Sequence, residues 1–188
     1  MADKKYKLHF GKISIIAIVV FAVLLAVDLI LKHFEVADSW NFDVIKGFIW
    51  VESDRRNTGS AFSLFADVVW GRIFLVTISV VLICALCAAF ALLPERFILL
   101  KIAIAMVVSG AMGNLIDRLV FGYVRDFVWV NMLFTSACCN FADFFIVFGV
   151  IVAIVDFLFL NEWAIIPLTR RAKEAREREK NKQDGEEN

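Results

Sequence analysis

Four long apolar stretches limit what this 188-residue chain can fold into. A helix that crosses a bilayer needs about 20 consecutive, mostly apolar residues. Hydrophobic residues make up 61% of the chain and its mean hydropathy is +0.75, which is more than a water-soluble core needs. We therefore predict an all-α membrane protein with four transmembrane helices, at roughly Ile13–Leu31, Ile73–Leu93, Phe97–Leu119 and Phe144–Leu160.

The distribution of Lys and Arg predicts how these helices are oriented. Short loops and flanks on the cytoplasmic side carry an excess of both residues. Of the 20 in the chain, thirteen lie in the N-terminal segment, in the turn at about 94–101 and in the tail from Arg170 to Lys182. We expect both termini in the cytoplasm and the segments at about 33–72 and 118–140 outside. The first stretch ends in Asp28 and Lys32 without a small-residue cleavage site, so we expect a retained helix.

The chain divides into a membrane domain, 1–168, and a charged cytoplasmic tail, 169–188, whose mixed charges are typical of a solvated segment. An insertion at about 33–72 is less apolar. Its apolar residues indicate short strands on either side of a turn at Lys46 and Gly47: Trp40, Phe42, Val44, Phe48 and Trp50. The run from Ser63 to Trp70 is apolar enough to lie along the membrane surface. We thus predict a small extracytoplasmic β-rich subdomain and an interfacial segment between the first two helices.

Two aspartates, Asp126 and Asp143, flank the loop that joins the last two apolar stretches, which places both at one membrane face. Ionisable groups at the edge of hydrocarbon are costly and by default suggest function. Two carboxylates held close together can share one proton and so supply an acid and a base. The pair predicts acid/base chemistry, such as the activation of water against a peptide bond.

Further polar residues recur at helical spacing inside the apolar stretches. Asp28 and Lys32 share one helix face, and Asn114, Asp117 and Arg118 cluster near the outer end of the third stretch. Small residues precede this cluster and allow helices to approach closely: Ser109, Gly110 and Gly113. Spacing alone leaves two alternatives open, a functional site and a network that only holds the helices together.

Other chemistries find little support in the sequence. The motif His-Glu-x-x-His is absent and the two histidines flank opposite ends of the first stretch, which argues against a zinc protease. Gly-x-Ser-x-Gly and a Gly-rich phosphate loop are also absent. Cys84 and Cys87 lie in an apolar stretch as small packing residues, and Cys138 and Cys139 lack a base. The net charge of zero does not suggest a nucleic-acid partner.

Five motifs in order resemble the lipoprotein signal peptidase (signal peptidase II) family, bacterial membrane aspartic proteases that remove the signal peptides of prolipoproteins. The resemblance covers roughly residues 13–160. It is carried by Asp28-x-x-x-Lys32, Asn57-Thr-Gly-Ser-Ala-Phe62, Gly110-Ala-Met-Gly-Asn-Leu-Ile-Asp-Arg118, Gly122-Tyr-Val-Arg-Asp-Phe127 and Asn140-Phe-Ala-Asp143.

The resemblance implies that Asp126 and Asp143 form a catalytic dyad. It further implies a set of residues that line the site, bind the substrate or support it: Asn57, Gly59, Asn114, Arg118, Asn140, Asp28, Lys32 and Asp117. The chain departs from the common family pattern at four positions, none of which removes a reacting group: Leu29, Ser60, Ser109 and Phe144. Of these, Phe144 is expected to narrow the pocket beside Asp143.

The family resemblance also implies partners and a location. The substrate would be a diacylglyceryl-modified prolipoprotein, cut just before the lipidated cysteine, at the extracytoplasmic face of the bacterial cytoplasmic (inner) membrane. The shared bilayer lipid would bring enzyme and substrate together, no metal or organic cofactor is implied, and inhibitors of the globomycin type are expected to bind. Two alternatives are a proton-coupled carrier and a non-catalytic membrane scaffold. A carrier would favour polar groups near the bilayer midplane rather than at one face.

Overall fold

The structure is a computed structural model that describes residues 8–38, 40–59, 69–131, 135–162, 164–170, 173–178 and 181. It contains four long helices, each apolar and long enough to cross a bilayer. They are α1 (Lys12–Asp38), α2 (Val69–Leu92), α3 (Ile98–Val120) and α4 (Phe141–Val155), and α4 continues as a π-helix, η2 (Asp156–Leu160). The prediction of four helices able to span a membrane is confirmed.

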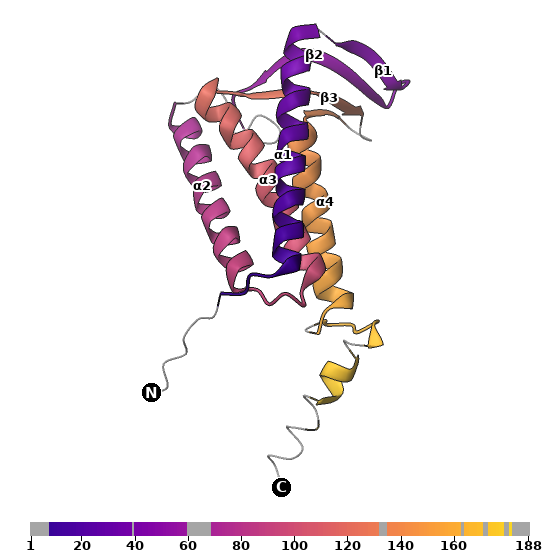
Figure 1. Cartoon of the computed structure of the whole chain (residues 1–188). Coiled ribbons are helices and arrows are strands. Elements are labelled where there is room, and N and C mark those ends of the chain that lie inside the picture. The colour runs from indigo at the N-terminus through magenta and orange to yellow at the C-terminus, as the bar shows by residue number, and fades with distance from the viewer. Residues whose placement is uncertain are drawn as a thin grey trace.

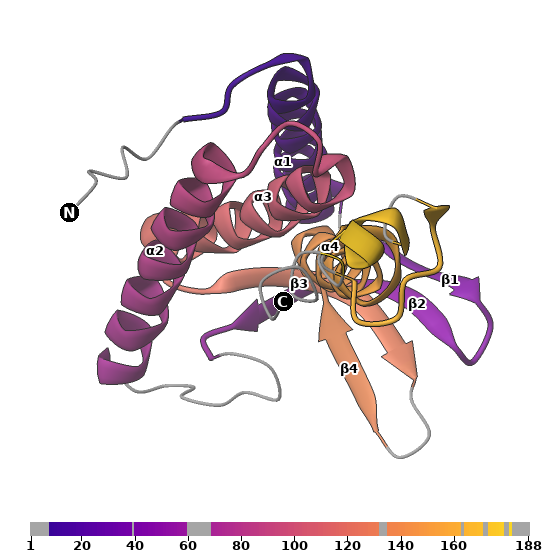
Figure 2. The same ribbon diagram turned by 90° about the horizontal axis from the view of Figure 1, so that it is seen from below.

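Helix α3 is the centre of the bundle. It packs against α1, α2 and α4, and the view along the bundle shows α2 on one side of it and α4 on the other (Figure 2). In its most apolar window 61% of the residues are buried inside the protein, against 11% to 17% for the other three helices. The outer helices therefore leave most of their apolar surface for contact with lipid, and α3 carries the residues that can be enclosed.

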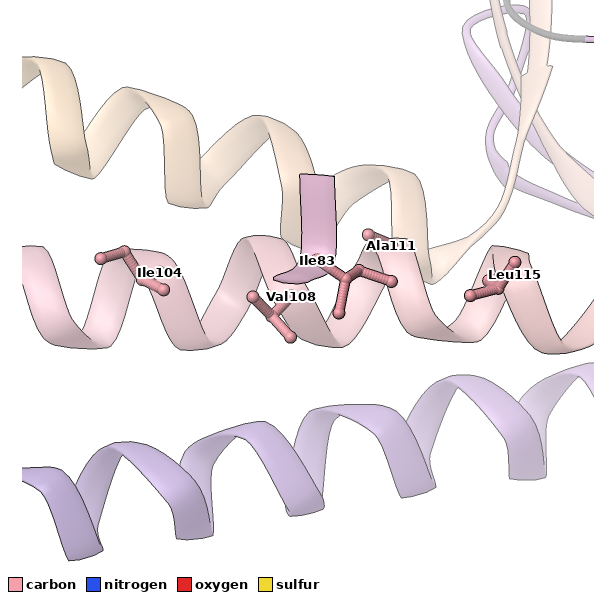
Figure 3. Packing of buried hydrophobic residues seen from close by; sticks show 5 residues of the cluster. All are labelled: Ile83, Ile104, Val108, Ala111 and Leu115. Carbon is pink, nitrogen blue, oxygen red and sulfur yellow. The ribbon is translucent and has the colours of Figure 1, made fainter. Parts of the chain in front are cut away.

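One apolar stripe of α3 fills the space between it and α2 (Figure 3). The stripe follows the helical repeat, so its members project from the same side of the helix. They pack around Ile83 of α2 and against half-buried residues such as Phe21 of α1. The buried members on α3 are Ile104, Val108, Ala111 and Leu115.

Glycines hold α3 and α4 close together on the opposite side of α3. A Cβ added to Gly110 would collide with the carbonyl oxygen of Ala142 and with the side chain of Ile146. In the other direction, a Cβ on Gly149 of α4 would come within 2.9 Å of the carbonyl oxygen of Ala103. The two helix backbones thus approach at the spacing that only small residues permit.

We expect Gly110→Val to destabilise the bundle by about 1–3 kcal/mol, because the added methyl groups force α4 away from α3. Thermal unfolding of the purified protein in detergent measures this loss. Ala88→Val is the matched control, since Ala88 is exposed on α2 and gains a similar bulk without a helix partner. Equal midpoints for the two variants would contradict the close approach at Gly110.

A four-stranded antiparallel sheet covers one end of the bundle (Figure 1). Its order is β1 (Asn41–Ile45), β2 (Ile49–Asn57), β3 (Val124–Asn131) and β4 (Ser136–Cys139). The two central strands come from different loops, and their register pairs Trp50 with Trp129 and Arg55 with Asp126. An irregularity between Val51 and Arg55 bends β2. The sheet therefore ties the α1–α2 connection to the α3–α4 connection above the bundle.

The predicted strands between the first two helices are present as β1 and β2, joined by a turn in which Gly47 has a φ of +75°. The other half of the sheet, β3 and β4, was not predicted. The expected interfacial segment Ser63–Trp70 lies outside the described residues, except for its last two positions, which open α2.

The helix boundaries also differ from the prediction. Helix α1 continues past Leu31 to Asp38, and α4 begins at Phe141 rather than at Phe144. The apolar pattern stops at Lys32, but the helix does not, because the Lys32 side chain is fully buried among partners.

A buried polar cluster closes the end of the bundle opposite the sheet. The carboxylate of Glu95, in the α2–α3 turn, accepts hydrogen bonds from the backbone N–H groups of Ile13 and Ser14 and so caps the N-terminus of α1. Lys101 donates to Glu95 and to the Ser14 hydroxyl, each at 2.7 Å. Hydrogen bonds from Lys101 and Ser14 lower the pKa of Glu95 to about 2. Lys101, which the sequence suggested as a flanking charge, is fully buried.

Candidate active site

Asp126 lies in β3, where the sheet meets the end of the bundle, and is 2% exposed. Each of its carboxylate oxygens accepts a hydrogen bond from an asparagine amide. Asn57 of β2 donates to Oδ2 at 2.8 Å, and Asn140 donates to Oδ1 at 2.7 Å. Asn57 is itself fixed, because its Oδ1 accepts from the backbone N–H of Gly59 at 3.0 Å. Two strands and the start of α4 thus orient this carboxyl group.

Asp143 lies in the first turn of α4, where it closes a capping box with Asn140. The Asn140 side chain accepts from the backbone N–H of Asp143 at 3.1 Å, and the Asp143 carboxylate accepts from the backbone N–H of Asn140 at 3.2 Å. The partial positive charge of a helix N-terminus favours a carboxylate at this position. The capping box at the start of α4 therefore fixes the orientation of the Asp143 carboxylate.

Two asparagine amides connect the aspartates. Asn114 of α3 donates from Nδ2 to Asp143 at 2.7 Å, while its Oδ1 accepts from Asn140 at 3.0 Å and from Lys32 at 3.1 Å. Because an amide has one oxygen and one nitrogen, these two donors set the orientation that points the Asn114 NH₂ group at Asp143. The geometry links Asp126, Asn140, Asn114 and Asp143 in one hydrogen-bonded chain.

A buried charge network supports this chain from beneath. Lys32 contacts Asp28 at 2.8 Å and Asp117 at 3.3 Å, and all three side chains are fully buried. Asp117 also binds Arg125 of β3 at 2.7 Å. Asp28 reaches across to α4, where it accepts from the backbone N–H of Ala142 at 2.9 Å. The ion pairs join α1, α3 and β3, and the Asp28 hydrogen bond adds α4, directly behind the two aspartates.

Gly113 makes the Asp28 contact possible. A Cβ at this position would collide with the Asp28 carboxylate and would stand 3.4 Å from the Cβ of Ala142. The absence of a side chain lets Asp28 pass between α3 and the start of α4. Gly113, which was predicted to allow close helix approach, thus also makes room for the Asp28 carboxylate.

Arg118, at the end of α3, holds Gly59, two residues after the end of β2. Its Nη2 donates to the carbonyl oxygen of Gly59 at 3.0 Å, and its charge lies within electrostatic reach of Asp143 and Asp126. Its buried Nε–H donates no hydrogen bond to any other residue that the structure describes. This N–H is a buried donor close to the two aspartates.

The surroundings of Asp126 raise its pKa to about 7. Burial is the largest cause, because it disfavours the charged form, and the nearby charge of Asp143 adds to it. The amides of Asn57 and Asn140 and the charge of Lys32 act in the opposite direction without cancelling the rise. Asp126 can therefore hold a proton close to neutral pH.

The two cysteines beside the site are poor nucleophiles. Burial raises the pKa of Cys139 to about 12 and also raises that of Cys138, so both thiols stay protonated at neutral pH. Cys139 donates to the carbonyl oxygen of Val128 at 3.3 Å. Within the described ranges, no group of three or more His, Cys, Asp or Glu side chains is arranged to hold a metal ion.

The structure brings the residues suggested by the sequence into one place. All ten lie in the contacts described above: Asn57, Gly59, Asp28, Lys32, Asn114, Asp117, Arg118, Asp126, Asn140 and Asp143. Sequence reasoning did not select Arg125. Alternation along β3 places its side chain on the face of the strand that points away from Asp126.

Phe144 and Ser109, two of the positions that depart from the family pattern, do not interrupt this network. Phe144 packs its ring edge to face against Phe141, at a centroid distance of 6.0 Å, within an apolar cluster under the sheet. The Ser109 side chain is fully buried. Ser60 falls outside the described residues.

Comparison with known proteins identifies the family. The family model described as Signal peptidase (SPase) II matches residues 20–159. The chain belongs to the signal peptidase II family. It is therefore a membrane-embedded peptidase, and the carrier and scaffold alternatives are set aside.

Named relatives and solved structures agree with this membership. The chain is 40% identical to the lipoprotein signal peptidase of Ectopseudomonas mendocina, over 61% of this chain and 69% of the relative. It is 36% identical to that of Acinetobacter baumannii, over 57% of this chain and 62% of the relative. A solved bacterial membrane enzyme superposes with a TM-score of 0.68 at 26% identity, over 81% of this chain and 92% of that one. The matched regions thus span about two thirds of the curated relatives.

Proposed function

We propose that this protein is an aspartic endopeptidase that removes signal peptides from diacylglyceryl-modified prolipoproteins and cuts before the lipidated cysteine. The relatives carry the name lipoprotein signal peptidase, which supports the substrate class. The observation that carries the mechanism is the pair of aspartates, Asp126 and Asp143, linked through the amides of Asn140 and Asn114.

In this mechanism the two aspartates have different tasks. Asp143, at the N-terminus of α4, is the ionised partner and takes a proton from the attacking water. Asp126, whose pKa lies at about 7, is the protonated partner. It donates to the scissile carbonyl oxygen and, as the tetrahedral intermediate collapses, a proton passes to the leaving amine. Amide donors already occupy one lone pair on each Asp126 oxygen, so the proton lies on the side left open for substrate.

The neighbouring residues position the substrate relative to the two aspartates. The planar guanidinium of Arg118, whose Nη2 already binds the Gly59 carbonyl, offers donors suited to a peptide carbonyl or a neighbouring carboxylate. Asn57 binds both Asp126 and the backbone of Gly59, and Asn114 and Asn140 fix the orientation of both carboxylates. Asp28, Lys32 and Asp117 act from behind through Asn114 and the start of α4.

The location follows the same reasoning. A diacylglyceryl group fixes its peptide at the membrane surface, and a dyad at the ends of α3 and α4 would meet it there, so the bilayer supplies proximity. The charge distribution supports an extracytoplasmic face in a bacterial inner membrane, with residues 169–188 as a cytoplasmic tail. Inhibitors of the globomycin type would compete for the same site.

The decisive experiment incubates the purified protein in lipid with a diacylglyceryl-modified prolipoprotein and separates the products. We expect one cut immediately before the modified cysteine, and an unmodified substrate that stays intact. The same cut in the presence of EDTA is expected, because two carboxylates supply the acid and the base. Cleavage that stops with chelator and returns with zinc would overturn the proposal.

A labelling experiment tests the orientation. In a variant whose four native cysteines are replaced, Asp43→Cys in exposed β1 should react with a membrane-impermeant maleimide on intact cells or spheroplasts. Arg178→Cys, in the exposed helical part of the tail, should react only after permeabilisation. The reverse pattern would place the dyad at the cytoplasmic face.

A further inference from the structure

Arg125 is the charged residue nearest to Asp126 in the chain, yet its side chain points away from the dyad. Successive side chains of a strand lie on opposite faces, so Arg125 leaves β3 on the side of Asp117. Its guanidinium contacts Asp117 Oδ1 through Nη2 at 2.7 Å and through Nε at 3.2 Å. Its Nη1 donates to the backbone carbonyl of Lys32 at 3.2 Å. One side chain thus joins β3 to α3 and α1.

The backbone of Arg125 is held as firmly as its side chain. Its N–H donates to Asp117 Oδ2 at 3.0 Å, and its carbonyl accepts from the Asn140 amide at 3.3 Å. The same Asn140 amide donates to Asp126. The backbone of Arg125, the residue that precedes Asp126, is therefore held by Asp117 at its N–H and by Asn140 at its carbonyl.

Arg125 also completes the charge balance of the buried network. Asp28 and Asp117 carry two negative charges, and Lys32 alone can neutralise only one of them. The Arg125 side chain, 12% exposed, supplies the second positive charge through its ion pair with Asp117. Without it, one net negative charge would remain close to the two aspartates of the dyad.

We propose that Arg125 is a positioning residue for the peptidase reaction. It clamps β3 onto α3 and α1, so that Asp126 faces Asp143, and it cancels the charge of Asp117 behind the dyad. It acts through the backbone and through Asp117 and does not touch the substrate. The inference rests on the proposed catalytic role of Asp126.

The two parts of this role have separate signatures. Loss of the clamp displaces Asp126 and lowers kcat more than it changes KM, because the substrate contacts are made elsewhere. Loss of the charge leaves a net negative field, which disfavours ionisation of the dyad and moves the alkaline limb of the pH–rate profile upward. A purely structural role would reduce only the amount of folded enzyme, and the pH profile of the folded fraction would be unchanged.

Other charged and titratable groups around Asp126 remain in place in these variants. They come from every element that packs near it and include Lys32 of α1, Arg118 of α3, Asp143 of α4, Arg55 of β2 and the thiols of Cys138 and Cys139. A change that follows Arg125 therefore adds to a constant background field.

The test compares Arg125→Met, Arg125→Lys and the double variant Arg125→Met with Asp117→Asn in the prolipoprotein cleavage assay. We expect Arg125→Met to lower kcat about tenfold or more through misplacement of Asp126. The alkaline limb should move up by about half a pH unit through the added negative charge. Arg125→Lys should return the alkaline limb to its wild-type pH because it keeps the positive charge. It should not recover the full kcat, because an ammonium cannot reproduce the fork on Asp117. The double variant should restore the limb, since its network is neutral again.

Arg56→Met is the matched control. Arg56 is the register partner of Arg125 on β2 and stacks over Tyr123, so its loss removes the same charge from the sheet without touching Asp117. The alkaline limb of the pH–rate profile of Arg56→Met should stay at its wild-type pH. Wild-type kcat and an unmoved limb in Arg125→Met would overturn the inference while leaving the peptidase proposal intact. A wild-type protein without cleavage activity would instead overturn the proposed function.

Discussion

Asp126→Asn and Asp143→Asn should each lower prolipoprotein cleavage on the order of 10³-fold or more, because asparagine keeps the shape of aspartate but cannot carry or accept the transferred proton. If the two carboxylates act as a unit, the double variant should be scarcely slower than either single variant. Cleavage of lipidated substrate under single-turnover conditions measures the three rates.

The variants should still insert and fold, and this can be checked separately. An amide at position 126 would face the N–H donors of Asn57 and Asn140, so a stability loss of about 1–3 kcal/mol is expected there. Asp156→Asn is the control, because Asp156 is a buried aspartate at the other end of the bundle that accepts a hydrogen bond from Asn161 at 2.9 Å. It should keep near wild-type cleavage. A double dyad variant that cleaved at the wild-type rate would contradict the mechanism.

Lys32→Met should destabilise the protein by about 3–5 kcal/mol, which is the cost of removing one partner from a buried ion pair. The methionine fills most of the space but leaves the Asp28 carboxylate buried without its cation. Asn114 also loses a donor that orients its amide, so cleavage should fall together with stability. Thermal unfolding in detergent and the cleavage rate measure the two effects.

Two further variants make this prediction specific. Asp28→Asn combined with Lys32→Met removes both charges of the pair, and should recover part of the lost stability. Arg170→Met breaks an exposed pair with Glu174 and should cost at most about 0.5 kcal/mol. A Lys32→Met protein as stable as Arg170→Met would show that the buried network does not hold the helices.

The sequence predicted the helices well because lipid-facing helices need long apolar runs, and such runs are visible without knowledge of the fold. It misplaced their ends where polar residues turn inward. Helix α1 passes through Lys32 and Glu35, both almost fully buried, whereas the apolar run in the sequence ends at Leu31. Lys101 shows the same limit, since its partner Ser14 is 87 residues away in the chain.

The second half of the sheet was not predicted because its central strand lacks an alternating pattern. Val124 and Val128 lie on one face of β3 and Phe127 lies on the other, and all three are buried. A strand buried on both faces reads as a continuous apolar run. In β1, by contrast, the turn at Gly47 and the alternation before it are plain in the sequence.

The candidate site was predicted in part. Asp126 and Asp143 were placed at one face because they flank the loop between the last two apolar stretches, helical spacing pointed to Asn114, and the family resemblance supplied Asn57 and Asn140. The amide chain through Asn114 and Asn140 depends on side-chain orientation across α3, β3 and α4, which spacing cannot reveal. Arg125 was missed because its partner Asp117 lies in a different element, and a single arginine in a strand gives no pattern.

The central claim is that Asp126 and Asp143 share one proton, and the pH dependence of cleavage tests it most directly. Because the pKa of Asp126 is raised to about 7, this carboxyl group is protonated below that pH and loses its proton above it. The rate should therefore fall as the pH rises through about 7, and a second ionisation should limit it at lower pH, both values belonging to the pair. A kcat/KM profile on lipidated prolipoprotein should form such a bell. A rate that stays constant or increases from pH 6 to pH 9 would contradict the shared proton.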